Sequence, residues 1–323
     1  MPASRINRRG LLRTAAAGAA LAPVAGLAPS ATAALTAVGS RTRTARDGSA
    51  TFRWLGTSGW RIDIGARTVL VDPYLSRFDT GLFRNAFDPA TELTVATETI
   101  AAHVGRPEAV LVTHSHWDHF NDVPEIAARS TARVFGTLTT YHLGLAYGIP
   151  AARLSPVKGG EVLDFGDYTV EVVASAHSRN ASYSMAFPGV RLSQPPKPRT
   201  IADLPEGDTL AYQVTVTGGP AVFFMGGSDF VERNLTGLAP DVAMVAMASS
   251  ESTHAYVPRL LDALDRPEVV VPVHWDNFET ELRNPPPVAP ADRQRLDAMV
   301  DAIRRVAPRT RILLPEYLTG YRF

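Results

Sequence analysis

The chain of 323 residues contains no cysteine. This absence excludes a disulfide scaffold, a cysteine-based zinc ribbon, an iron–sulfur protein and a cysteine nucleophile. The chain also has no net charge, because 32 basic side chains balance 32 acidic ones. A nucleic-acid-binding protein normally has a net basic face and a charged disordered tail has one sign in excess, so the composition argues against both. Because cysteine is absent, any transition-metal site must be built from carboxylates and from some of the eight histidines.

The zero net charge conceals a basic N-terminus. Residues 1–33 contain four arginines and no acidic residue, which leaves 28 basic and 32 acidic side chains in the remainder. The pair Arg8-Arg9 precedes a mildly apolar stretch at 14–27, and Ala31-Thr32-Ala33 follows. This order is typical of an export signal, and the arginine pair with weak hydrophobicity resembles a twin-arginine signal. The stretch is too short and too weakly apolar for a stable membrane span.

These features divide the chain into three parts. We expect a twin-arginine signal peptide at 1–33, a flexible linker at 34–49 that is rich in Ser, Thr, Arg and Gly, and one large folded domain at 50–323. The expected partner of the signal is the twin-arginine export machinery. Cleavage near Ala33 would release an extracellular or periplasmic protein with no transmembrane segment in its mature part. The lack of cysteine fits this route, because a protein exported in the folded state needs no oxidative folding.

Beyond residue 50, apolar runs predict a layered α/β protein with mixed sheets. The predicted helices are Val123–Arg129, Thr139–Ala146, Val257–Leu264 and Ala291–Val306. The predicted strands are Thr51–Leu55, Trp60–Ile64, Thr68–Val71, Ala109–Thr113, Tyr168–Val173, Leu210–Thr217, Ala221–Met225, Val242–Met247, Val269–Val273 and Arg311–Leu314. The long segment 178–208 is rich in Pro, Gly and Ser, and we expect it to be a lid or a binding loop.

One short segment has the composition of a metal site. His114-Ser115-His116-Trp117-Asp118-His119 follows the predicted strand Ala109–Thr113. Residues two apart in an extended segment share a face, so His114 and His116 can bind one metal ion. Asp118 and His119 come where the chain turns into a helix and can point toward a second ion. A solvated polar loop is the alternative, but this combination of residues is rare by chance.

Three further metal-competent residues each follow an apolar run. They are His177, Asp229 and His274. Taken singly, each could be a cap or a surface residue. Together with His114 they would lie at the ends of four strands, which is the usual place for a site in an α/β sheet. The sequence thus predicts one metal centre built from these seven residues.

The order and the flanking residues resemble the metallo-β-lactamase fold superfamily over residues 51–315. Within it they resemble the branch of L-ascorbate-6-phosphate lactonase-like proteins and N-acyl-phosphatidylethanolamine phospholipase D. The matching pieces are Trp54-Leu55-Gly56, Leu70-Val71-Asp72-Pro73, Ala176-His177-Ser178-Arg179 and Pro272-Val273-His274-Trp275. The resemblance implies a four-layer αββα sandwich with a dinuclear site at one edge. It implies that His114, His116 and His177 hold the first metal, that Asp118, His119 and His274 hold the second, and that Asp229 bridges them.

Two positions depart from the branch. Gly usually stands before the bridging Asp, whereas this chain has Ser228 before Asp229. After the last ligand Gly-Thr-Phe is commoner, whereas this chain has Asp276-Asn277-Phe278. No ligand is lost, so metal binding is expected, but resemblance to this branch does not identify the substrate.

The predicted function is an exported metal-dependent hydrolase. Two divalent ions, Zn²⁺ first with Mn²⁺ and Fe²⁺ as alternatives, would activate a hydroxide for attack on an ester, lactone or phosphodiester bond of a small-molecule or lipid-like substrate. Asp118 would orient the hydroxide and shuttle its proton, and His254 is a candidate substrate-facing residue. Asp72 would be either an acceptor for a ligand histidine or a simple turn residue. Arg179 would be either an anion clamp or a surface residue.

Three other functions remain open at this stage. A β-lactamase-type amide hydrolase and an iron-dependent oxidoreductase could use the same ligand set. A binding module on a decayed site is a third alternative, and the intact ligand set argues against it.

Overall fold

A computed structural model of the protein describes residues 49–323. The signal peptide predicted at 1–33 lies outside these residues, as does the linker predicted at 34–49 apart from Ser49. Within the part of the chain described, none of the helices combines the length and the apolar character needed to cross a membrane.

Two mixed sheets of seven strands each form the centre of the domain. The first has the order β14-β1-β2-β3-β4-β5-β6 and the second the order β13-β12-β11-β10-β9-β8-β7. The strands of the first sheet are β1 (Ala50–Gly56), β2 (Gly59–Ile64), β3 (Arg67–Val71), β4 (Ala109–Leu111), β5 (Arg133–Gly136), β6 (Leu154–Pro156) and β14 (Gly320–Tyr321). The strands of the second are β7 (Val162–Asp164), β8 (Tyr168–Ala174), β9 (Leu210–Val216), β10 (Ala221–Met225), β11 (Val242–Ala246), β12 (Val269–Val273) and β13 (Arg311–Ile312).

Each sheet is antiparallel in one half and parallel in the other. β1, β2 and β3 pair antiparallel, and β3 to β6 continue parallel. In the second sheet β7 to β10 pair antiparallel, and β10 to β13 continue parallel. The parallel strands require helical crossovers, and these cover the outer faces.

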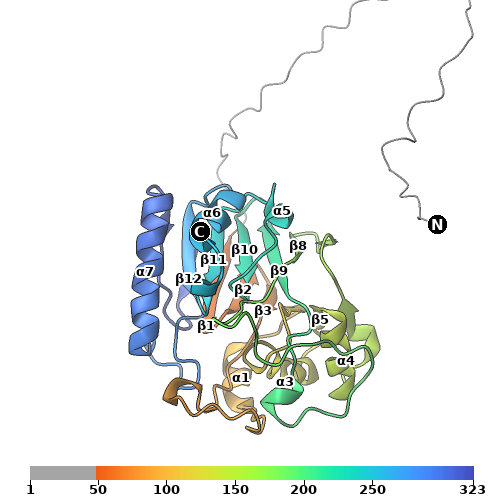
Figure 1. Ribbon diagram of the computed structural model, residues 1–323. Helices are drawn as coiled ribbons and strands as arrows, with labels where there is room; N and C mark the ends of the chain where they lie inside the picture. Colours follow the sequence, from red (N-terminus) through yellow and green to blue (C-terminus); the bar gives the residue numbers. More distant parts are fainter. Residues whose placement is uncertain (1–48) are drawn as a thin grey trace, which may run out of the picture. The chain divides into compact units, whose positions relative to one another are not determined.

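The helices form two outer layers (Figure 1). They are α1 (Thr97–His103), α2 (Trp117–Phe120), α3 (Val123–Arg129), α4 (Leu138–Ala146), α5 (Glu232–Leu235), α6 (Tyr256–Ala263) and α7 (Pro290–Val306). Figure 1 shows α6 and α7 beside β11 and β12, whereas α1, α3 and α4 accompany β3 and β5. In α7 the apolar residues Leu296, Met299 and Ile303 recur at helical spacing and are buried.

Buried side chains fill the spaces between these layers. One cluster joins the inner faces of the two sheets, with Phe52 and Ile62 from the first and Val170 and Phe224 from the second. A second cluster packs the outer face of the first sheet against α1, α3 and α4. This arrangement is the predicted αββα sandwich.

The sequence predictions of secondary structure differ from the structure mainly in short elements. The four predicted helices correspond to α3, α4, α6 and α7 within one residue at each end. β4 ends at Leu111 instead of Thr113, because the Thr113 backbone N–H donates to the carboxylate of Asp72 and so leaves the ladder. The sequence analysis does not predict α1, α2, α5, β5, β6, β7 or β14, because segments of two to seven residues carry little periodicity that would distinguish them from turns.

Candidate metal centre

The segment 114–119 forms the junction between β4 and α2. His114 follows the buried end of β4, and His116 directly precedes the four-residue helix α2, which carries Asp118 and His119. All four of these side chains are buried, with exposed fractions of 1–5%. The turn therefore directs them into the protein toward the ends of β8 and β12.

Three histidines from two sheets form a first triad. His114, His116 and His177 each offer one nitrogen, and these nitrogens lie within 4.8 Å of one another. The three ring centroids are 4.7–4.8 Å apart, and the rings stand nearly perpendicular to one another. His177 reaches this position because it follows β8 by three residues.

Hydrogen bonds to the protein leave one nitrogen of each ring available. The Nε2 atom of His116 is 2.9 Å from the Ala186 carbonyl, and the Nδ1 atom of His177 is 2.7 Å from the Ser178 carbonyl, so each of these nitrogens donates. Burial lowers the pKa of His114, His116 and His177, and the pKa of His116 falls to about 3. The triad is thus neutral near pH 7, which is the protonation state that a metal ligand needs.

Asp118, His119 and His274 form a second triad within the same 4.8 Å limit. The Oδ2 atom of Asp118 is 3.5 Å from Nε2 of His119 and 3.2 Å from Nε2 of His274. Burial favours the neutral acid, but His119 and His274 outweigh it and hold the pKa of the Asp118 carboxyl well below its usual range. The carboxylate is therefore ionised and available as a ligand.

His119 differs from the other histidines because two carboxylates flank it. Its Nδ1 atom donates to Oδ2 of Asp72 over 2.8 Å, which leaves Nε2 facing Asp118. Burial opposes protonation, but Asp118 and Asp72 together raise the pKa of His119 to about 10. Asp72 also accepts from the backbone N–H and the hydroxyl of Thr113, and Gly226 permits this packing because a Cβ there would lie 2.0 Å from that hydroxyl. Asp72 is thus an acceptor that fixes a ligand histidine.

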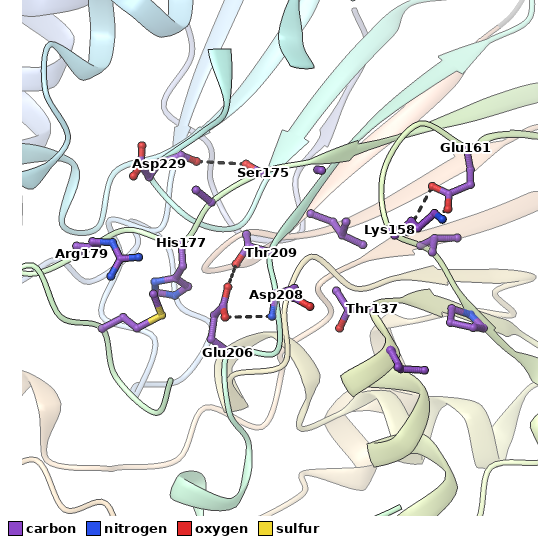
Figure 2. Close-up of a pocket in the computed structure, with 17 residues that line it drawn as sticks. Thr137, Lys158, Glu161, Ser175, His177, Arg179, Glu206, Asp208, Thr209 and Asp229 are labelled. Carbon is purple, nitrogen blue, oxygen red and sulfur yellow. Dashed lines mark hydrogen bonds between the residues drawn. The ribbon is translucent and has the colours of Figure 1, made fainter. Parts of the chain in front are cut away.

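The structure does not bring Asp229 into either triad. Asp229 follows β10 and its Oδ1 atom accepts from the Phe230 backbone N–H, whereas no oxygen of Asp229 lies within 4.8 Å of all ligand atoms of either triad. Figure 2 shows its side chain directed away from His177. The bridging role that the resemblance implies stays a prediction.

His254 also lies apart from the triads. It precedes α6, its side chain is exposed, and its backbone carbonyl accepts from Arg259. It does not line the cavity described next, and its substrate-facing role stays a prediction. Of the aromatic residues near the ligand residues in the sequence, Tyr183 is 76% exposed, and the buried ones are Trp117, Phe120, Phe230, Trp275 and Phe278.

A cavity of about 800 Å³ opens beside the first triad. His177, Arg179, Glu206 and Asp229 line it near the triad, and Lys158 lies farther along it (Figure 2). Several lining residues belong to the loop 178–208, which agrees with the expected binding loop. No sequence pattern indicates Glu206, because its position depends on the course of that irregular loop. Glu206 accepts from the Thr209 hydroxyl and from the Asp208 backbone N–H.

The donor set fits a pair of divalent transition-metal ions. Five imidazoles and one carboxylate converge in two groups of three, and the rings of His114 and His119, one from each group, lie 3.9 Å apart. Imidazole with carboxylate suits Zn²⁺, Mn²⁺ and Fe²⁺, and three protein ligands leave a further position of each ion for substrate or water.

The chain is similar to proteins named metal-dependent hydrolases and to solved structures of the same fold. The UPF0173 metal-dependent hydrolase of Pyrobaculum aerophilum is 24% identical over 257 residues, which cover 78% of this chain and 92% of that protein. The structure of Igni18, a metallo hydrolase from Ignicoccus hospitalis, superposes with a TM-score of 0.54 at 18% identity and covers 85% of this chain and 98% of that one. CmlA, a diiron β-hydroxylase from Streptomyces venezuelae, gives a TM-score of 0.55 at 13% identity over 85% of this chain and 54% of that one. At such identities the structural similarity establishes the fold alone.

The family model of the beta-lactamase superfamily domain matches residues 67–275. This range begins with β3 and ends one residue after His274, so it contains all six residues of the two triads. The chain belongs to the metallo-β-lactamase superfamily.

Proposed function

We propose that the chain is an exported metal-dependent hydrolase that holds two divalent ions and cleaves an ester, lactone or phosphodiester bond. The observation that carries this proposal is the convergence of two buried three-ligand groups beside a cavity of about 800 Å³. Zn²⁺ is the proposed metal, because imidazole-rich three-ligand sites with an open position are typical of catalytic zinc. The relatives named metal-dependent hydrolases support the same reaction class.

The bound ions would supply an activated water and polarise the bond to be cleaved. The residues of the chain contribute position and proton transfer. Asp118 directs Oδ2 toward His119 and His274, so its other oxygen can hold a water molecule by a hydrogen bond. Its depressed pKa keeps it ionised, and it can accept the water proton and pass it to the leaving group.

The cavity lining supports a polar substrate. Arg179 and Lys158 place two cationic side chains on the walls, and an anionic group such as a phosphate or a carboxylate would pair with either of them. The carboxylates of Glu206 and Asp229 stand near the triad. We therefore favour a substrate that carries polar groups at both ends over one that is wholly apolar.

The experiment that tests the reaction class is a turnover assay with the purified full chain. The metal-free protein is reloaded with Zn²⁺, Mn²⁺ or Fe²⁺ and offered phosphodiesters, lactones, other esters and β-lactams. We expect turnover of one of the first three classes, dependent on added metal and lost in the variant His116→Ala. Cleavage of β-lactams alone would favour the amide-hydrolase alternative.

The fold shared with a diiron hydroxylase keeps an oxidoreductase as the second candidate. Metal analysis separates the two candidates, because an oxygenase requires iron whereas a hydrolase works with redox-inert Zn²⁺. Oxygen consumption by the iron-loaded chain, without hydrolysis by the zinc-loaded chain, would overturn the proposal.

Export is proposed from the sequence, because Arg8 and Arg9 lie outside the described residues. Replacing both with lysine should abolish export through the twin-arginine route while leaving the folded enzyme inside the cell. Cell fractionation with an antibody against the domain measures this. Unchanged export of the variant would contradict the assignment.

A further inference from the structure

A buried ion pair lies next to the second triad and takes no part in it. Arg77 Nη2 donates to Oδ2 of Asp276 over 2.9 Å, and the two side chains are only 3% and 0% exposed. The other arginine–carboxylate pairs within residues 49–323 have at least one side chain that is 24% exposed or more. Burying a charge pair is costly, so this one requires a local reason.

His274 depends on its backbone for its position more than the other ligand histidines do. In four of the five histidines of the triads, one ring nitrogen is within hydrogen-bonding distance of a protein oxygen, which fixes the direction of the ring. These four are His114, His116, His119 and His177. The Nδ1 atom of His274 is buried and has no such partner among the described residues. The direction of the His274 ring is therefore set by its backbone and its packing.

That backbone adopts an unfavourable conformation. His274 has φ +60°, in the left-handed region that residues with a Cβ rarely occupy. Its N–H donates to the Thr57 carbonyl over 2.9 Å, and the Thr57 N–H donates to Oδ1 of Asp276 over 3.0 Å. Asp276 thus supports His274 through Thr57, because it accepts from the N–H of Thr57, whose carbonyl in turn accepts from the N–H of His274.

Arg77 and Tyr317 hold Asp276 from its other side. Arg77 Nη2 also donates to the Asn277 carbonyl over 2.9 Å, and the Tyr317 hydroxyl donates to Oδ2 of Asp276 over 2.8 Å. Gly56 allows Arg77 to enter, because a Cβ at that position would lie 2.1 Å from Arg77 Nη1. The aspartate that departs from the resembled sequence pattern is therefore the centre of a built network.

We propose that Arg77, Asp276 and Tyr317 form a positioning network that sets the metal affinity of the Asp118/His119/His274 triad. The inference rests on the proposed function, since it assumes that this triad holds a metal ion. It predicts that damage to the network weakens the second triad selectively and leaves the His114/His116/His177 triad unchanged.

The test is a Co²⁺ titration of the metal-free full chain, followed by visible absorption, in which each triad gives its own binding phase. Asp276→Asn keeps the shape of the side chain but removes its charge. We expect the affinity of the second phase to fall about 10–100-fold while the first phase stays the same. Tyr317→Phe removes one hydroxyl and should give a smaller loss in the same phase.

Two controls separate positioning from a general loss of stability. Leu296→Ala makes a cavity under α7, a helix that contributes no residue to the network, and should lower Tm without altering either phase. The double variant Arg77→Met/Asp276→Leu removes both charges. Asp276→Leu alone should lower Tm by ~5–15 °C, because it leaves Arg77 buried without a partner, and the double variant should regain most of this loss. The affinity of the second phase should stay weak in the double variant, because the Thr57 N–H still lacks its acceptor.

The outcomes distinguish the inference from the proposed function. Two phases in the unchanged chain and an unaltered second phase in both Asp276→Asn and Tyr317→Phe would overturn the inference alone. Equal weakening of both phases would also overturn it, because the effect would then be general. Fewer than two phases in the unchanged chain would overturn the proposed function, and the inference with it.

Discussion

The two triads are made of similar residues but provide opposite electrostatic settings. His116 and His119 are both buried, yet the pKa of His116 falls to about 3 whereas that of His119 rises to about 10. Burial acts in the same direction on both, so the difference arises from the carboxylates of Asp118 and Asp72 beside His119. His116 and His119 are thus only three positions apart, yet the first belongs to a triad of neutral imidazoles and the second to a triad that contains the ionised carboxylate of Asp118.

This contrast has a consequence for metal binding. A cation entering the first triad meets only uncharged ligands, whereas one entering the second meets an ionised carboxylate but must displace the proton of His119. The predictions below test this contrast, and they run from the largest expected effect to the smallest.

Removing one ligand from each triad should abolish metal binding. The double variant His116→Ala/Asp118→Ala leaves each group with two ligands, so the metal-to-protein ratio measured by mass spectrometry should fall from two to near zero. His254→Ala serves as the control and should retain both ions, because His254 lies outside the triads. Retention of full metal content by the double variant would disprove the site.

The two triads should respond differently to pH. A metal ligand must be neutral, and the folded metal-free chain holds a proton on His119 up to about pH 10. The affinity of the second triad should therefore rise about tenfold per pH unit between pH 6 and 8, whereas the deprotonated His116 adds no such slope to the first. Competition with a metal buffer measures both affinities. The same dependence of affinity on pH in both triads would contradict the proposed electrostatic difference between them.

Asp72→Asn should weaken the second triad alone. The amide keeps the size of the side chain but loses the charge that holds the Nδ1 proton of His119, and loss of such a partner costs about 10–100-fold in metal affinity. Thr113→Val removes another bond to Asp72 but also the hydroxyl next to Nδ1 of His114, so this variant should weaken both triads and serves as the contrast. A larger loss in the first triad than in the second would contradict this role of Asp72.

Asp229→Ala should have the smallest effect on metal content. Its carboxylate accepts from the Phe230 backbone N–H and lines the cavity. We therefore expect the variant to keep two ions but to lose turnover, because the wall of the cavity is altered. Loss of one ion would show instead that Asp229 bridges the pair, as the resemblance implies.

Much of this account could be predicted from local sequence. The segment 114–119 and its preceding apolar strand indicate candidate ligands, because two-residue spacing in an extended chain directs His114 and His116 to the same side. His177 and His274 could be placed because each follows a strong strand pattern. Family resemblance then supplied the pairing of the sheets and the division into two triads.

The rest depends on contacts that no local pattern contains. The direction of the Asp229 carboxylate is decided by a single backbone N–H after β10. The pair Arg77–Asp276 joins positions 199 residues apart, and Asp276 was visible in the sequence only as a departure from a common pattern. Asp72 could be read as a ligand partner or as a turn residue, and its contact with His119 decided between them.

Anomalous diffraction from crystals of the metal-loaded chain tests the central claim most directly. The account predicts two peaks, one within reach of His114, His116 and His177 and the other within reach of Asp118, His119 and His274. A single peak shared by both groups, or peaks away from these six residues, would contradict it.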